Sequence, residues 1–113
     1  MPKYIKNLSH EEVLKLAEQI AVLPGQVVSK TLAQNDCVSI TLFGFDKGEE
    51  IGTHDSNGDA FVYILDGTGK LTVDGKEYLV SKGEALIMPA KKPHSVYAVE
   101  KFKMLLTVVF PKA

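Results

Sequence analysis

The chain has 113 residues, of which 45% are apolar and 24% charged, with a formal net charge of −1 at pH 7. This length suits one ordinary domain, and the near-neutral charge without a basic stripe argues against nucleic acid as a partner. The single cysteine, Cys37, excludes an internal disulfide. We expect a cytoplasmic protein without membrane contact, because no apolar run follows the N-terminus and no stretch approaches the ~20 apolar residues of a membrane span.

The first predicted element is a short α-helix in an N-terminal segment, residues 1–26. Ser9 and Glu12 have the spacing of a capping box, and Leu8 and Val13 flank this cap as a hydrophobic staple. Apolar residues then recur at helical spacing, at Val13, Leu16, Ala17 and Ile20. Because so short a helix needs a packing partner to be stable, we expect it to cover a face of the remaining structure.

From residue 27 onward the sequence predicts short β-strands separated by turns. The predicted strands cover residues 27–32, 38–43, 61–65, 71–73, 77–80, 85–88, 94–99 and 102–110. Many short strands with frequent turns are typical of a sandwich or barrel, so residues 27–113 are predicted to form an all-β barrel that makes one domain with the N-terminal segment. Cys37 opens a strand and is expected to be a small buried side chain.

Two segments of the predicted barrel carry glycine, histidine and proline at defined spacings. In the first, five residues separate Gly48 from His54, and Gly67 follows at the end of a predicted strand. In the second, five residues separate Gly83 from Pro89, and a histidine at position 94 follows a short turn. These spacings resemble the two motifs of the cupin superfamily over most of the chain, and the strand pattern agrees with them independently.

The resemblance implies a small single-domain conserved barrel of the cupin type, a double-stranded β-helix or jelly roll. It also implies a metal site of three imidazoles and one carboxylate, a set that suits Fe, Mn, Ni or Zn. Only His54 and His94 occupy ligand positions here, while Ser56 and Ala60 stand where the family has its second histidine and its glutamate. Asp59 is the neighbouring carboxylate, and strand alternation predicts that it points to the opposite face.

The predicted ligand pocket combines these positions with apolar residues on the inward faces of two strands. It comprises His54, Ser56, Ala60, Val62, Ile64, Leu86, Met88 and His94. Loss of the glutamate and of one histidine should leave a roomier, less charged pocket, so we expect a barrel that binds a small organic molecule with little or no metal dependence.

Two alternatives stay open. One is a metal-dependent enzyme, resembling the dioxygenases or isomerases of the family, in which His54 and His94 bind one divalent ion of Fe, Mn, Ni or Zn. The other is a structural or interaction role, because residues 61–65 and 102–110 are apolar on both faces and need a cover. That cover would be the N-terminal helix or a second subunit, and the resemblance implies a homodimer.

Overall fold

The computed structural model describes residues 4–111, which form nine β-strands and one turn of 3-10 helix. The elements are η1 (Leu16–Gln19), β1 (Val27–Gln34), β2 (Val38–Phe45), β3 (Glu50–His54), β4 (Asp59–Asp66), β5 (Thr68–Val73), β6 (Lys76–Ser81), β7 (Ala85–Met88), β8 (His94–Tyr97) and β9 (Phe102–Val109). Among these residues we find no helix long and apolar enough to span a membrane.

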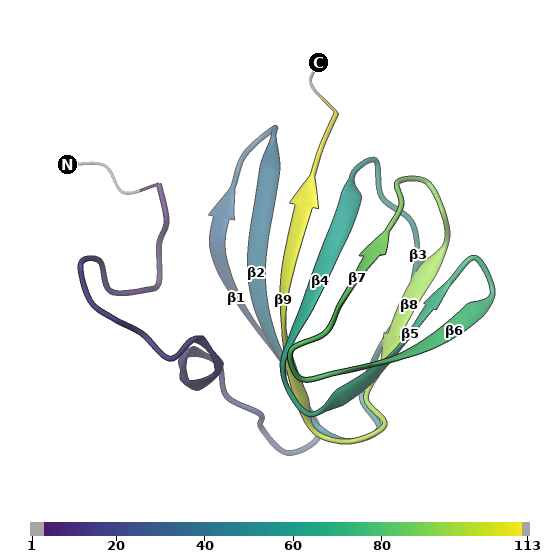
Figure 1. The fold of residues 1–113 in the computed structure, drawn as a ribbon, viewed down its shortest axis with the longest axis horizontal. Helices are drawn as coiled ribbons and strands as arrows, with labels where there is room; N and C mark the ends of the chain where they lie inside the picture. The colour runs from purple at the N-terminus through teal and green to yellow at the C-terminus, as the bar shows by residue number, and fades with distance from the viewer. Residues whose placement is uncertain (1–3, 112–113) are drawn as a thin grey trace.

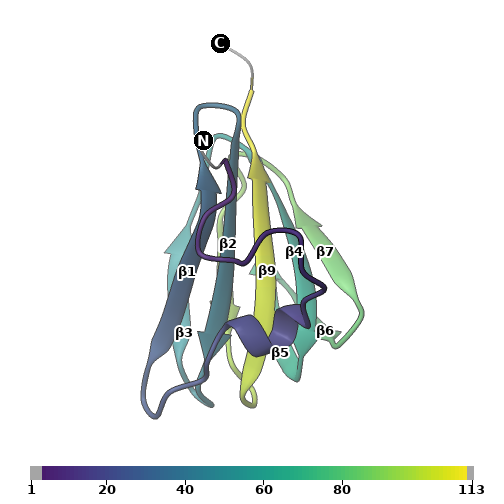
Figure 2. The same ribbon diagram turned by 90° about the vertical axis from the view of Figure 1, so that its left-hand side faces the viewer.

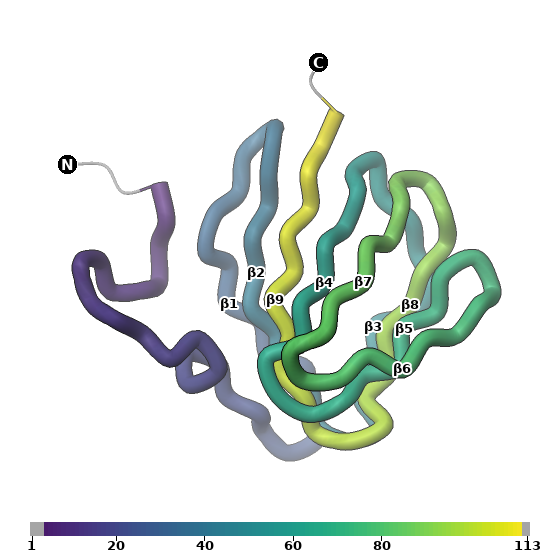
Figure 3. Tube along the Cα trace, in the orientation of Figure 1, coloured from purple at the N-terminus to yellow at the C-terminus, as the bar shows by residue number. Residues whose placement is uncertain are grey.

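The strands form two antiparallel sheets that pack face to face (Figure 1). One sheet has the order β1-β2-β9-β4-β7 and the other the order β3-β8-β5-β6. Figure 3 follows the same path as a tube and shows β5 and β6 as the two arms of a hairpin. Strands distant in sequence therefore lie side by side, which brings the two motif segments together. The all-β jelly-roll barrel expected from the cupin resemblance is confirmed.

The main core lies between the two sheets and is built from alternate residues of each strand. Phe45 and Phe102 stack at its centre, with ring centroids 4.6 Å apart and planes inclined by 8°. The fully buried side chains around them include Leu71, Ile64 and Met104. Because successive strand residues point to opposite faces, each sheet contributes one apolar face to this core.

The N-terminal segment covers the outer face of the five-stranded sheet (Figure 2). Ile20 is buried against Leu42 and Leu65 in a second apolar cluster, separate from the main core. The Lys103 ammonium donates to the Ala17 carbonyl over 2.7 Å, and the Lys6 N–H donates to the carbonyl of an edge-strand residue, Leu32, over 2.8 Å. The predicted covering role of this segment is confirmed.

The predicted α-helix is shorter and tighter than expected. Its only helical turn is the 3-10 turn η1, whose N-cap is Lys15 without a side-chain capping bond. The Ser9–Glu12 capping box does not form a helix start, since Glu11 has a φ of 58°, and Val13 is fully exposed instead of completing the staple. Nucleating a helix is costly, and the apolar residues of this segment reach the sheet without one.

The strand predictions agree with the structure at eight of the nine strands. The missed strand is β3, whose sequence Glu-Ile-Gly-Thr-His has one large apolar residue and therefore no alternating pattern. Cys37 is a second correction, because it is exposed in the β1–β2 turn instead of buried. There the Asn35 carboxamide oxygen accepts from the N–H groups of Cys37 and Val38, so turn chemistry decides this position.

Candidate functional site

A cavity of about 130 Å³ lies between the two sheets at one end of the barrel. Its polar lining consists of His54, Ser56 and His94. Its apolar lining comes from both sheets and consists of Phe43, Ile51, Ala60, Met88, Val96, Met104, Leu106 and Val108. His94 is buried, with 4% of its surface exposed, whereas His54 is exposed. The polar groups therefore run from the solvent-facing mouth into the barrel.

His54 and His94 meet because they are directly opposite partners in the β3–β8 ladder. Ile51 pairs with Val96 in the same ladder, so β3 advances three residues where β8 advances two. With regular alternation, three residues would turn a side chain to the other face. The irregularity between Ile51 and His54 adds one residue to β3, and this extra residue returns the His54 side chain to the cavity.

Backbone carbonyls fix how both imidazoles carry their hydrogens. The Nδ1 atom of His54 lies 2.9 Å from the Gly52 carbonyl oxygen, and Nδ1 of His94 lies 3.1 Å from that of Lys92. A carbonyl oxygen can only accept, so each Nδ1 carries the hydrogen and donates it. In its neutral form each ring therefore presents an unshared lone pair at Nε2.

These two Nε2 atoms lie 3.2 Å apart, with ring centroids separated by 4.3 Å and planes inclined by 69°. Burial is the main cause that lowers the pKa of His94 below its ordinary value, and the His54 charge acts in the same direction. The Lys92 carbonyl and the Asp55 carboxylate oppose this shift. The neutral form of His94 is thus favoured.

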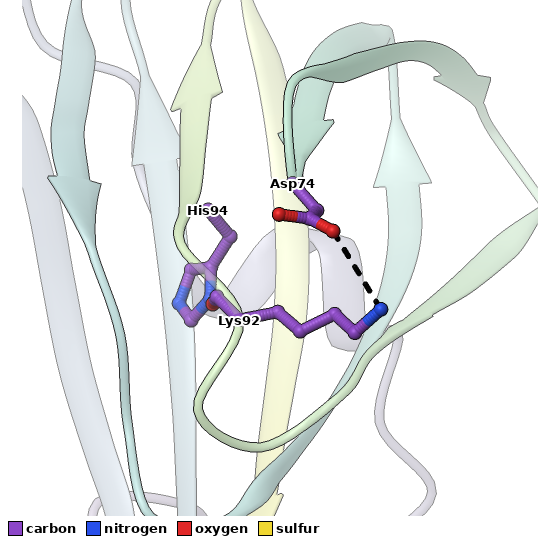
Figure 4. A network of polar contacts seen from close by, with 3 residues as sticks. All are labelled: Asp74, Lys92 and His94. Atoms are coloured by element: carbon purple, nitrogen blue, oxygen red, sulfur yellow. Dashed lines mark hydrogen bonds and ion pairs between the residues drawn. The ribbon is translucent and has the colours of Figure 1, made fainter.

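The loop between β7 and β8 positions His94. The Asp74 N–H donates to the Pro93 carbonyl over 2.8 Å, and the Lys92 ammonium lies 3.6 Å from the Asp74 carboxylate. Figure 4 shows this ion pair beside the His94 ring. Both charged side chains are more than half exposed, so their attraction contributes little. The backbone bonds to Pro93 and Lys92 are the contacts that orient the imidazole.

The same loop is attached to the Ser56 turn at the cavity mouth. The Lys91 N–H donates to the Ser56 carbonyl over 2.7 Å, and the Ala90 N–H donates to the Asp59 carboxylate over 2.8 Å. The Ser56 hydroxyl donates to the Gly58 carbonyl over 2.8 Å and accepts from the Gly58 N–H over 3.2 Å. Asp59 therefore holds the loop and is not part of the cavity lining.

A family model described as a cupin domain matches residues 41–110, which include both histidines of the cavity. The chain belongs to the cupin family. Similar solved structures include a conserved protein of unknown function, SPY1581, from Streptococcus pyogenes, with a TM-score of 0.96 and 46% identity over 99% of this chain and 98% of that one. A cupin superfamily protein from Desulfitobacterium hafniense has a TM-score of 0.90 and 36% identity over 95% and 98%.

A curated relative is the uncharacterized protein MJ1618 of Methanocaldococcus jannaschii. It is 32% identical over 95 residues, which cover 81% of this chain and 59% of the relative. The cupin described here thus spans about three fifths of that relative's length.

The structure brings five of the eight predicted pocket residues to the cupin cavity. They are His54, Ser56, Ala60, Met88 and His94. Val62 and Ile64 do point inward, but they are fully buried in the core and do not line the cavity. Strand alternation assigns a face but not a depth, and the cavity occupies only the end of β4 near Ala60.

Leu86 is also absent from the cavity lining. It is partly buried and lines a separate hollow of about 380 Å³. Other residues of this hollow come from β5, β6 and the turn between them, among them Val73 and Tyr78. β7 and β6 are the edge strands of their sheets, and Leu86 lies where these two edges face each other. It shares the strand face of Met88, as predicted, but not its surroundings.

Six lining residues were not predicted, and they are the remaining apolar residues of the cavity wall. Three of them, Met104, Leu106 and Val108, alternate along β9. This period of two is visible in the sequence, but the apolar residues that interrupt the alternation, Leu105 and Val109, obscure which set faces inward. Phe43, Ile51 and Val96 come from β2, β3 and β8, and only the sheet order shows that these strands meet at one cavity.

Proposed function

We propose that this cupin binds a small organic molecule in its barrel cavity, with little or no metal dependence. The supporting observation is the composition of the lining, in which eight of eleven residues are apolar and the polar three run from the exposed His54 to the buried His94. A pocket with an apolar wall and a few convergent polar groups is the usual form of a small-molecule site.

The volume limits what the cavity can enclose. Ligand pockets commonly measure about 300–1,000 Å³, whereas this cavity has about 130 Å³. An apolar cavity of about 150 Å³ is known to bind benzene. The enclosed part of the ligand is therefore about the size of one small ring or a short alkyl chain, and any larger part must extend past the exposed His54.

A thermal-shift screen of small organic compounds tests this proposal. We expect a hit to raise the melting temperature of the wild-type protein and to lose most of that effect in the His54→Ala and His94→Ala variants. The exposed His10 provides a matched control, because it contacts the Ile5 carbonyl in the N-terminal segment, away from the cavity. Hits that shift all four proteins equally would rule out binding at this site.

A metal-dependent cupin enzyme is the second candidate, favoured by the two Nε2 lone pairs that converge within 3.2 Å. The donor set decides whether an ion fits. Among residues 4–111 no group of three or more His, Cys, Asp and Glu side chains could hold an ion together, while structural zinc uses four protein ligands and catalytic zinc three. The residues present thus fit a resident ion poorly, and water or a chelating substrate would have to supply most of its ligands.

Elemental analysis separates the two candidates. The protein should be purified without chelators or nickel columns, and its melting temperature measured with and without Fe²⁺, Mn²⁺, Ni²⁺ or Zn²⁺. Substoichiometric metal and an unchanged melting temperature are expected for the organic-ligand site. Stoichiometric metal, or an activity that requires one of these ions and is lost with chelator, would favour the enzyme.

A further inference from the structure

When both imidazoles are neutral, every side-chain hydrogen at the polar end of the cavity is donated to the protein's own backbone. The Nδ1–H groups of His54 and His94 donate to the carbonyls two residues before them, and the Ser56 hydroxyl donates to Gly58. The other side chains of the lining are apolar. The neutral site therefore offers lone pairs on two imidazole nitrogens and one hydroxyl oxygen, and no side-chain donor.

A ligand head group must complement this set of acceptors. A carboxylate or phosphate would place its own lone pairs against those of His54, His94 and Ser56, without a hydrogen to share. An alkylammonium group has three N–H donors, one for each acceptor, and its charge strengthens each of these hydrogen bonds. The exposed Asp55 carboxylate adjoins His54 in sequence, and its charge also favours a cation at this end.

The charges of neighbouring lysines do not reverse this preference. The Lys92 ammonium lies beside the Asp74 carboxylate and outside the cavity lining. Lys91 contributes its backbone N–H to the Ser56 carbonyl, and its residue is exposed to solvent, where its charge is strongly screened. The local field at the mouth is thus set by the two imidazoles, the hydroxyl oxygen and Asp55.

We propose that the organic ligand of this cavity is a primary alkylammonium compound, whose ammonium group is held by His54, His94 and Ser56 and whose apolar chain lies among Met88, Met104 and their neighbours. This inference rests on the proposed function and assigns its ligand class. The enclosed chain is about as large as a butyl group, given a cavity of about 130 Å³.

Three probes with four carbon atoms each test the ligand class: n-butylammonium, n-butanol and n-butyrate. The protein is first treated with chelator and studied at pH 8, where an imidazole of ordinary pKa, about 6.5, is neutral. Binding is followed by the methyl resonances of ¹³C-labelled Met88 and Met104, which line the cavity. We expect saturable shifts with n-butylammonium, at least tenfold weaker binding of n-butyrate, and n-butanol between them.

Variants locate the binding site and distinguish an error in the ligand class from the absence of a small-molecule site. His54→Ala should weaken n-butylammonium binding at least fivefold, and the His10→Ala control should not change it. If n-butyrate binds as tightly as n-butylammonium, or His54→Ala has no effect on n-butylammonium, the ligand class is wrong. The small-molecule site itself stands if any probe saturates the methionine shifts, and falls if none does.

Discussion

His94 is a buried imidazole whose neutral form is stabilised by the fold, since burial lowers its pKa below the ordinary value of 6.5. The unfolded chain then binds a proton at higher pH than the folded protein does. Stability from this residue is complete above the unfolded pKa of about 6.5 and declines as the pH falls towards the lowered folded pKa. We expect the urea midpoint to fall between pH 7 and pH 5.

The His94→Gln variant is the control for this pH dependence, because glutamine fills similar space without titrating. Its urea midpoint should vary less with pH over the same window than that of the wild-type protein, while His10→Ala should follow the wild-type curve. Identical curves for wild type and His94→Gln would show that this histidine does not contribute to the acid sensitivity.

Restoring the missing family ligands should restore metal binding. Ser56 and Ala60 both line the cavity with His54 and His94, so Ser56→His with Ala60→Glu would give three imidazoles and a carboxylate around one point. Outer-shell contacts of metal sites are worth about 10–100-fold in affinity, and two direct ligands should contribute at least about a hundredfold. Calorimetry with Mn²⁺ or Ni²⁺ measures this, with each single substitution as a control; equal affinities for wild type and double variant would contradict it.

The residues of the site were predictable where a motif fixed their spacing, and not where depth in the barrel decided. The spacing of the glycines from His54 and His94 is enough to identify both histidines from the sequence. Val62 and Leu86 have the correct inward face, but one lies in the solid core and the other beside a neighbouring hollow. Such differences depend on how the two sheets pack on each other, and the sequence of a single strand does not determine that packing.

At the scale of elements, strands were easier to predict than the segment that crosses them. Alternation within eight strands reflects burial on one or both faces, and these strands pair over most of their lengths. The N-terminal segment has helical spacing in its sequence, yet its apolar residues pack against Leu42 and Leu65 of the sheet without forming an α-helix. Packing on an existing surface here outweighed local helix preference.

The turn between β4 and β5 depends on the glycine that closes the first motif. Gly67 has a φ of 73°, and a Cβ there would lie only 2.1 Å from the Lys101 carbonyl oxygen. Gly48 has a φ of 86° but open space around it. A left-handed conformation costs an ordinary residue about 1–2 kcal/mol, and the overlap at Gly67 should add about 1–3 kcal/mol.

We therefore expect Gly67→Ala to lower the free energy of unfolding clearly more than Gly48→Ala does. Urea denaturation of the two variants measures the difference, and the shared left-handed φ makes Gly48→Ala the matched control. Equal losses in the two variants would mean that the turn moves away from Lys101 without cost.

At the scale of the whole molecule, the N-terminal segment covers only part of the outer face of the five-stranded sheet. Phe61, Ile87 and Val109 remain 43%, 56% and 57% exposed on or beside this face. Phe61 pairs with Ile87 across β4 and β7 and with Thr107 across β4 and β9, so the row contains no charged residue. Asp59 pairs with Val109 beside this row, so the surface is apolar with a carboxylate at its edge. An apolar surface of this kind can pack on a second copy of itself in a two-fold arrangement.

We predict a homodimer that uses this face. Light scattering after size exclusion should give twice the chain mass of 12.4 kDa at micromolar concentration, and Ile87→Lys should give the monomer. Leu79→Lys is the matched control, because Leu79 is also well exposed but lies on β6 of the other sheet. A monomeric wild-type protein would overturn the prediction.

The two histidines of the cavity lie on one layer of the barrel, and most of its apolar lining lies on the other. His54 and His94 belong to the four-stranded sheet, whereas Met88, Met104 and Leu106 belong to the five-stranded sheet. A ligand that is hydrogen-bonded at one end and packed at the other would cross-link the two sheets non-covalently. Bound ligand should then slow amide hydrogen exchange in β8 and β9 together, although these strands share no ladder. Ligand binding would thus be detectable as a joint stabilisation of both sheets.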